Sequence, residues 1–236
     1  MHIVFKGHTI SNLSEWEKLI FSGKKALHWK KGRSAYSLAD YIINQNGAKH
    51  IATIISPFIN EEFNLVRAHP EFEARFDTYG HGREHDLGIF GTTASGKKIF
   101  IGIEAKVDES FGDTIASAKR KANAKLARGE NTNALKRIEE LLAFNFDEVN
   151  QEDLQLRYQL LFSTAGTLCI EADIHIMLIL VFKTETYDIP KGQKNYMDLI
   201  KFINKSNATN LTPDANRIDI SGKALTIIYK EIPYGR

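Results

Sequence analysis

The stretch "HDLGIFGTTASGKKIFIGIEAK", residues 85–106, predicts two β-strands joined by a tight turn. Apolar residues alternate along "DLGIFG" and "KIFIGIEAKV", and "TTASGK" between them has the composition of a hairpin loop. If the hairpin folds symmetrically about residue 95, Asp86 lies directly opposite Glu104, with Cβ atoms about 4.5–5.5 Å apart. Lys106 shares a face with Glu104, because side chains two positions apart on a strand point the same way. The stretch therefore predicts an Asp, a Glu and a Lys together at one end of a hairpin.

Length and composition are those of an ordinary globular protein. The chain has 236 residues, of which 43% are hydrophobic and 25% charged, and its formal net charge is only +2. Bulk charge therefore does not by itself indicate a nucleic-acid binder. One cysteine, Cys169, excludes an internal disulfide framework. The longest apolar run, residues 174–182, is far shorter than the about 20 residues of a membrane helix, so we expect a cytoplasmic protein.

Periodicity along the rest of the chain predicts helices on both sides of the hairpin. The expected helices cover residues 14–21, 34–45, 48–63, 114–143 with a break near 128–133, 152–172 and 195–206, and the other expected strands cover 71–79, 174–183 and 224–232. This order predicts an α/β (α+β) fold in which a mixed sheet is flanked by helices. We expect an N-terminal helical region, residues 1–60, packed on a core formed by residues 61–236.

Two carboxylates held close together repel each other unless a positive charge lies between them. Hard divalent cations such as Mg²⁺ or Mn²⁺, which prefer oxygen ligands, are the usual solution. Lys106 can orient a water molecule or stabilise negative charge developing on a phosphoryl oxygen. Together these groups are suited to phosphodiester hydrolysis by a metal-activated water.

The arrangement of Asp86 on one strand and "EAK", residues 104–106, on the next resembles the catalytic core of the PD-(D/E)XK nuclease superfamily. The resemblance covers roughly residues 60–182 and implies a restriction-endonuclease-like fold with Mg²⁺-dependent cleavage of DNA or RNA. It implies Asp86 and Glu104 as metal ligands and Lys106 as the catalytic lysine. His85 stands where the family pattern has proline. The stretches "HWKKGRSAYSLA" and "RYQLLFSTAGTL" also resemble a bacterial group of unassigned function placed near this superfamily.

Three further residues are candidates for accessory roles at this site. Some members of the superfamily take an extra acid from the helix before the first core strand, which makes Glu62 a candidate, although a solvated helix end is the simpler explanation. Gln159 follows the motif on a helix where relatives often place a Gln or Tyr facing the metal. His85, beside Asp86, is a candidate for proton transfer.

A run of basic residues follows the hairpin, with Glu130 as the only acid between residues 119 and 137. Such a run is commonly a solvated helix face, but after a nuclease-like motif it is also suited to contact a phosphate backbone without sequence readout. The candidate nucleic-acid contacts are Lys119, Arg120, Lys121, Lys125 and Arg128. The expected partner is nucleic acid, DNA in preference to RNA, with no membrane; a homodimer is a candidate assembly, since both strands of a duplex must be cut.

The leading hypothesis is a metal-dependent nuclease that acts on DNA, in restriction or another defence role. One alternative is a non-catalytic nucleic-acid binder, because residues 34–55 contain a helix, an Asn-Gly turn and a second helix, loosely like a helix-turn-helix. The other alternative is a protein-interaction module built on a nuclease-like fold. Metal dependence and strand cleavage discriminate between these hypotheses.

Overall fold

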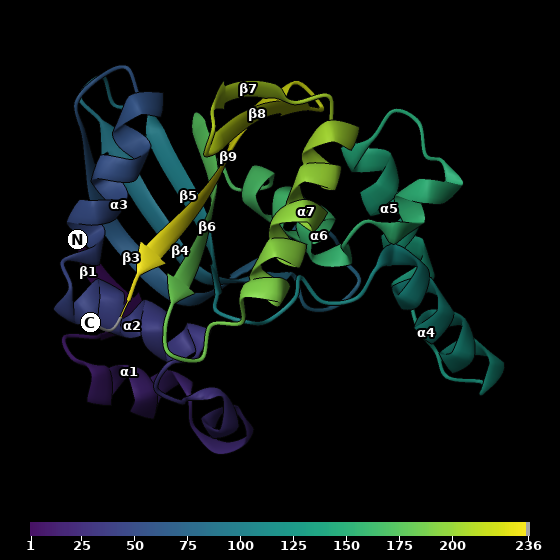
Figure 1. Ribbon diagram of the computed structural model, residues 1–236, viewed down its shortest axis with the longest axis horizontal. Coiled ribbons are helices and arrows are strands. Elements are labelled where there is room, and N and C mark those ends of the chain that lie inside the picture. Colours follow the sequence, from purple (N-terminus) through teal and green to yellow (C-terminus); the bar gives the residue numbers. More distant parts are fainter. Residues whose placement is uncertain (235–236) are drawn as a thin grey trace.

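The computed structural model describes residues 1–234, apart from the side chain of Lys24, and contains one mixed sheet flanked by helices (Figure 1). The strands are β1 (His2–Phe5), β2 (His8–Thr9), β3 (Phe63–Ala74), β4 (Arg83–Thr93), β5 (Lys98–Lys106), β6 (Ile174–Lys183), β7 (Thr209–Thr212), β8 (Ala215–Ile220) and β9 (Lys223–Pro233). The helices are α1 (Leu13–Ile20), α2 (Ser34–Asn44), α3 (Gly47–Ile55), α4 (Ile115–Ala127), α5 (Ala134–Asn145), α6 (Tyr158–Leu168) and α7 (Ile189–Lys205). The predicted α/β (α+β) fold is confirmed.

The sheet has the strand order β2-β1-β3-β4-β5-β6-β9-β8-β7. Strands β3, β4 and β5 are antiparallel neighbours, whereas β5, β6 and β9 run parallel. The β4–β5 hairpin pairs Leu87 with Ile103 and Gly91 with Ile99, and both pairs are centred on residue 95. The predicted register is therefore confirmed from Leu87–Ile103 to Thr92–Lys98, and Asp86 and Glu104 lie one position beyond the last of these pairs, at the end of the hairpin away from the turn.

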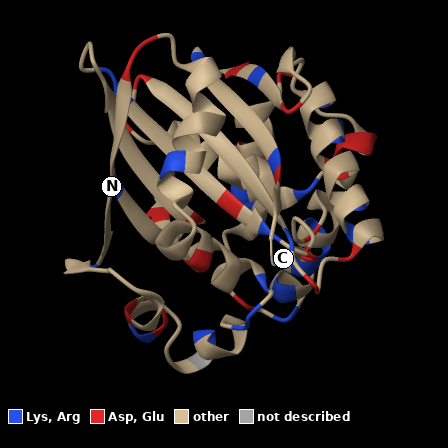
Figure 2. Cartoon of the chain, turned by 60° about the vertical axis from the view of Figure 1, so that its left-hand side comes forward, with Lys and Arg blue, Asp and Glu red and all other residues tan. Residues whose placement is uncertain are grey.

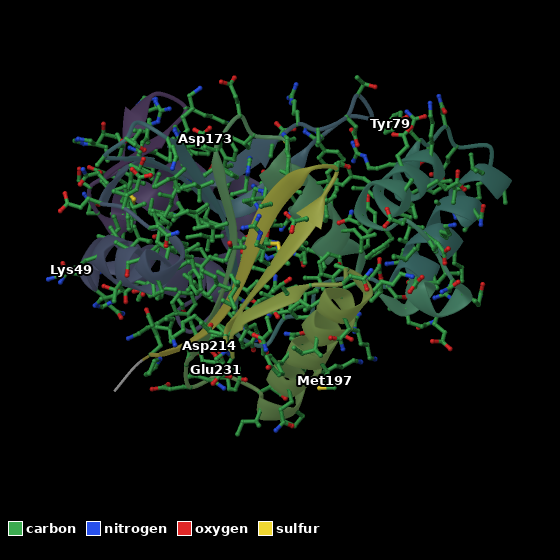
Figure 3. The ribbon with its side chains drawn as sticks, turned by 90° about the horizontal axis from the view of Figure 1, so that it is seen from above. Lys49, Tyr79, Asp173, Met197, Asp214 and Glu231 are labelled. Carbon is green, nitrogen blue, oxygen red and sulfur yellow. The ribbon has the colours of Figure 1, made fainter. Side chains whose placement is uncertain are left out.

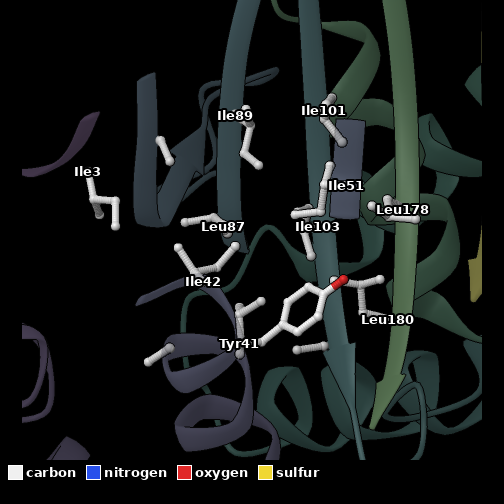
Figure 4. Packing of buried hydrophobic residues seen from close by; sticks show 14 of the residues in the cluster. Ile3, Tyr41, Ile42, Ile51, Leu87, Ile89, Ile101, Ile103, Leu178 and Leu180 are labelled. Carbon is white, nitrogen blue, oxygen red and sulfur yellow. The ribbon is translucent and has the colours of Figure 1, made fainter. Parts of the chain in front are cut away.

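Helices cover both faces of the sheet, and β5 sends alternate side chains into two separate apolar clusters. Ile101 and Ile103 face α2 and α3, where Tyr41 and Ile51 pack against them (Figure 4). The other face packs against α4, α5, α6 and α7, and its cluster includes Leu161 and Ile179. Glu104 and Lys106 alternate with the isoleucines and therefore belong to this second face. Figure 2 shows that charged residues lie mainly on helices, loops and strand ends.

The turn between α2 and α3 follows from the sequence Asn46-Gly47. Asn46 has a left-handed backbone (φ +54°), which asparagine tolerates better than most residues. A Cβ atom at position 47 would lie 2.6 Å from the carbonyl oxygen of Tyr41, so only glycine fits there. Both helices turn their apolar faces to the sheet, and the two-helix unit is thus anchored on the domain core (Figure 4).

Several elements differ from the sequence-based expectation. The helix predicted to continue to residue 63 ends at Ile55, and β3 begins at Phe63 and stops at Ala74 rather than covering 71–79. Strand β3 lacks a clean polar–apolar alternation because a bulge interrupts it between Leu65 and Arg67. The short strands β1, β2, β7 and β8 were also not predicted. β1 lies parallel to β3, so the first 60 residues contribute to the sheet as well as to the helical layer.

Among residues 1–234, no helix combines the length and the apolar character required to cross a membrane.

Candidate active site

The predicted Asp, Glu and Lys lie together at the end of the β4–β5 hairpin opposite its turn, near the start of β4 and the end of β5. Oδ2 of Asp86 accepts a hydrogen bond of 2.7 Å from the backbone N–H of Ala105, the residue between Glu104 and Lys106. Glu104 and Lys106 are buried, with exposed fractions of 1% and 7%. The hydrogen bond fixes the Asp86 carboxyl group beside the strand that carries the other two residues.

Glu104 is surrounded by hydrogen-bond donors from β4 and α6. Arg83 forms an ion pair with Oε2, and Nε2 of Gln159 donates to the same oxygen over 2.7 Å. On the other oxygen, Oε1, Ser163 donates over 3.0 Å and Nδ1 of His85 lies 3.1 Å away. Gln159 was a candidate from the sequence and lies at the site. Arg83 and Ser163 were not, and no spacing rule in the sequence connects them to Glu104.

His85 is completely buried behind Glu104. Burial lowers the pKa of its imidazole, which favours the neutral ring. Because a carboxylate only accepts, we assign the proton to Nδ1, which donates a hydrogen bond to Oε1 of Glu104. The ring lies between two glycines: a Cβ at Gly102 would approach Cε1 of His85 to 2.8 Å, and one at Gly166 would approach Nε2 to 3.2 Å. This enclosed position suits His85 to orienting Glu104 rather than to exchanging protons with solvent.

The two acidic residues of the hairpin have opposite pKa shifts. Burial, and then the negative charge of Glu104, raise the pKa of Asp86 to about 6. Burial also disfavours the charged form of Glu104, but the Arg83 guanidinium and the His85 hydrogen bond outweigh it and hold the pKa of Glu104 well below its usual range. Glu104 is therefore the permanently ionised member of the pair.

Lys106 extends from the last position of β5 into the same region. Its ammonium group lies 5.5 Å from the centroid of the Phe111 ring. Within residues 1–234, it forms no ion pair and no side-chain hydrogen bond. Its charge nevertheless acts on Asp86 and Glu104, since it favours the ionised form of both carboxyl groups. Lys106 is thus a buried cation whose hydrogen-bonding capacity is available to a ligand.

A second acidic group, which the sequence did not predict, lies next to Asp86 on β3. Strand β3 pairs Pro70 with Leu87 and Phe72 with His85, which places Glu71 opposite Asp86. Glu71 has a left-handed backbone (φ +49°), rare for this residue type. Burial and the nearby acidic residues raise its pKa to about 7.

Lys25, in the N-terminal region, balances the negative charge of this second acidic group by forming ion pairs. Its ammonium lies 2.5 Å from Glu71 and 3.0 Å from Glu84. The N-terminal segment thus contacts the neighbourhood of the site through a charged residue, in addition to its apolar packing on the sheet.

Glu62 is not part of the site. Because β3 begins at Phe63 and pairs Phe63 with Thr93, Glu62 lies at the turn end of the hairpin, where its carbonyl accepts from Ala94 N–H. Thr93, the last residue of β4, is seven residues along the strand from Asp86, about 23 Å. The expectation failed because it required a helix to continue to residue 63.

The predicted basic residues lie on α4, which projects from the body of the molecule (Figure 1). Of its residues, Ile115 and Ala122 are buried, while Arg120, Lys121, Lys125 and the adjoining Arg128 are exposed and Lys119 is half-buried. A cavity of about 260 Å³ is lined by Lys121, Lys125 and Gln159, together with Phe111. Gln159 lines this cavity and also donates to Glu104, so the cavity and the site share this residue.

The carboxylate oxygens of Asp86 and Glu104 are ligands of the type that a divalent cation prefers, but they do not form a complete set of protein ligands. Among residues 1–234, no group of three or more His, Cys, Asp or Glu side chains is arranged to hold a metal ion. Mg²⁺ commonly binds through only one or two carboxylates and retains several waters, and Asp86 and Glu104 meet this requirement. Glu104 can bind a metal directly only if one of its four hydrogen-bond donors leaves.

A larger cavity lies away from this site, between α7 and β9. It measures about 770 Å³, and its lining includes Tyr196, Met197, Asp214 and Glu231. Met197, Asp214 and Glu231 lie on one side of the molecule, away from Tyr79, which lies toward α4 and α5 (Figure 3). The cavity shares no lining residue with the group around Glu104.

Comparison with known proteins assigns the chain to a family without assigning an activity. No curated protein matches the chain, and no solved structure matches it. The profile of one family, described as a domain of unknown function (DUF6946), matches residues 9–233. The match covers nearly the whole chain, which therefore belongs to the DUF6946 family.

Proposed function

We propose that this protein is a Mg²⁺- or Mn²⁺-dependent nuclease of the PD-(D/E)XK type that hydrolyses phosphodiester bonds, in DNA rather than RNA, in restriction or another defence role. The observation that carries the proposal is the hairpin register. It brings Asp86 against the backbone of Ala105, between Glu104 and Lys106. A purely structural strand end gives no reason to gather the half-buried carboxyl group of Asp86, the buried carboxylate of Glu104 and a buried ammonium that forms no ion pair within residues 1–234.

Each residue of the site has a distinct role in this proposal. Asp86 and Glu104 would hold the divalent cation, which when bound supplies charge neutralisation and an activated water. Lys106 would donate hydrogen bonds to a phosphoryl oxygen as negative charge develops on it. His85 and Ser163 hold Oε1 of Glu104, so that the carboxylate keeps one orientation.

Helix α4 would bind the phosphate backbone beside the site. Lys121 and Lys125 line the cavity that also contains Gln159, so a backbone lying along α4 leads toward Glu104. These contacts are electrostatic and carry no sequence information.

Replacing Lys121 and Lys125 together with alanine should weaken DNA binding and reduce the slope of log Kd against log[salt] by about two, because two phosphate contacts are lost. Fluorescence anisotropy with a labelled duplex at several salt concentrations measures both quantities. The matched control is the double substitution Lys194→Ala and Lys201→Ala, which removes two exposed lysines from α7. Equal effects of the two double variants would contradict a backbone-binding role for α4.

The proposal is tested by incubating the protein with supercoiled plasmid and Mg²⁺ or Mn²⁺. Asp86→Asn should abolish nicking and linearisation, because asparagine can still accept the Ala105 hydrogen bond but lacks the charge that binds a cation. Asp173→Asn is a matched control, since Asp173 also accepts a β5 backbone N–H over 2.7 Å, at Lys98 near the other end of the strand. Cleavage by Asp86→Asn at the wild-type rate would refute the proposal.

A non-catalytic nucleic-acid binder is the second candidate function. It is favoured by the complete occupation of the Glu104 oxygens by protein donors, which makes the network self-sufficient without a metal. In that case the wild-type protein and Asp86→Asn should bind DNA equally well with or without EDTA, and neither should break a strand.

A further inference from the structure

The carboxylate of Glu104 has no lone pair left for another ligand. A carboxylate offers about four acceptor positions, two on each oxygen. Arg83 and Gln159 occupy Oε2, and His85 and Ser163 occupy Oε1. Any direct contact between Glu104 and a cation must therefore displace one of these four side chains.

The two donors on Oε1 are held in place. His85 is completely buried, and its ring packs closely on two glycines: a Cβ at Gly102 would lie 2.8 Å from Cε1, and one at Gly166 would lie 3.2 Å from Nε2. Ser163 is buried in the middle of α6, where its hydroxyl oxygen also accepts a hydrogen bond of 2.9 Å from Nε of Arg83. Oε1 is therefore the fixed oxygen of Glu104.

The two donors on Oε2 are less buried than the two on Oε1. Gln159 lies in the first turn of α6 and lines the cavity beside α4. The Arg83 side chain is 12% exposed, and the negative charges of Asp86 and Glu84 also act on its guanidinium. Arg83 therefore has other acceptors nearby if it leaves Glu104. Of the two donors on Oε2, Arg83 carries a positive charge and the amide of Gln159 carries none.

We propose that Arg83 is the resident counter-cation of Glu104 and competes with a divalent cation for its Oε2 oxygen, so that Arg83 sets the metal affinity of the site. This inference rests on the proposed function, since it requires Asp86 and Glu104 to bind a cation. Arg83 is a positioning residue in this role: it keeps Glu104 ionised and oriented before the metal binds, and it raises the metal concentration at which the site fills.

The test is Mn²⁺ binding by isothermal titration calorimetry, without any nucleic acid. Arg83→Met, which keeps an unbranched side chain but removes the charge, should bind Mn²⁺ at least about tenfold more tightly than wild type; an adjacent opposite charge changes the proton affinity of a carboxylate by a similar factor. Arg83→Lys should fall between the two. Arg33→Met is the matched control, because Arg33 pairs with Asp108 over 2.5 Å outside the Glu104 network, and it should leave the affinity unchanged.

The outcomes separate this inference from the proposed function. If wild type and Arg83→Met bind Mn²⁺ equally, or if Arg83→Met binds more weakly, as a merely structural role for Arg83 predicts, competition by Arg83 is refuted while the metal site stands. If neither protein binds Mn²⁺, both proposals fail. If Arg83→Met is unfolded without metal, Mn²⁺ should restore its cooperative thermal transition, and failure to do so refutes the inference.

Discussion

Replacing Glu104 with alanine should lower the free energy of unfolding by about 3–5 kcal/mol, the cost of breaking a buried ion pair by removing one partner. The substitution leaves the Arg83 guanidinium buried without its principal carboxylate. It also removes the acceptor of His85, Gln159 and Ser163, and each buried donor left without a partner adds to the cost. Urea unfolding followed by circular dichroism measures the change, with the slope against urea checked for two-state behaviour.

The matched control removes the carboxylate partner of Lys98 in an exposed ion pair at the other end of β5. Glu171 lies 2.5 Å from Lys98, but its side chain is 91% exposed, so Glu171→Ala should leave stability unchanged within error. The double variant Glu104→Ala with Arg83→Met should be less destabilised than the sum of the two single variants, because the orphaned charge is gone. A loss of less than about 1 kcal/mol for Glu104→Ala would show that the network around it contributes little.

This coupling decides which substitutions can test catalysis. Loss of activity in a Glu104 variant would reflect lost stability as well as lost chemistry, because four side chains depend on its carboxylate. Asp86 is different, because within residues 1–234 its carboxyl group accepts one hydrogen bond, from the backbone N–H of Ala105, and the side-chain oxygen of asparagine can accept the same bond. Asp86 and Lys106 are therefore the informative positions.

The hairpin could be predicted from the sequence because both of its determinants are local. Alternation fixes which residues face the core, and the turn composition fixes the centre of symmetry, so the pairing of Leu87 with Ile103 follows. The same local information predicted β6 and the break between α4 and α5. Strand β3 could not be predicted in the same way, because its bulge disrupts the alternation and its residues 63–70 carry no clear period.

The surroundings of Glu104 could not be predicted because they depend on packing between distant elements. Arg83 and Ser163 are 80 positions apart and meet only when α6 packs against β4. Glu71 lies opposite Asp86 because of the β3–β4 register. Its left-handed backbone could not be predicted, because glutamate rarely adopts this conformation. The sequence thus indicated the charged residues of the hairpin, whereas the groups that set their protonation came from tertiary structure.

Replacing Lys106 with methionine should reduce plasmid cleavage by at least about a hundredfold while leaving the fold intact. Loss of one donor to a developing oxyanion typically costs this much in rate. Methionine retains an unbranched apolar side chain beside Phe111, and the Lys106 ammonium has no protein partner within residues 1–234 that its removal would orphan. Cleavage rate under single-turnover conditions and thermal unfolding together measure the two effects.

Lys98→Met, at the opposite end of β5, is the control for a lost positive charge on the same strand. Lys98 is exposed and pairs with Glu171, so its substitution should change neither cleavage nor stability. DNA binding provides the decisive contrast: Lys106→Met should bind the duplex nearly as well as wild type, because Lys106 acts on the reacting phosphoryl group rather than on the backbone bound by α4. If Lys106→Met instead loses binding and cleavage in equal proportion, Lys106 is a binding residue, and the catalytic role assigned to it is wrong.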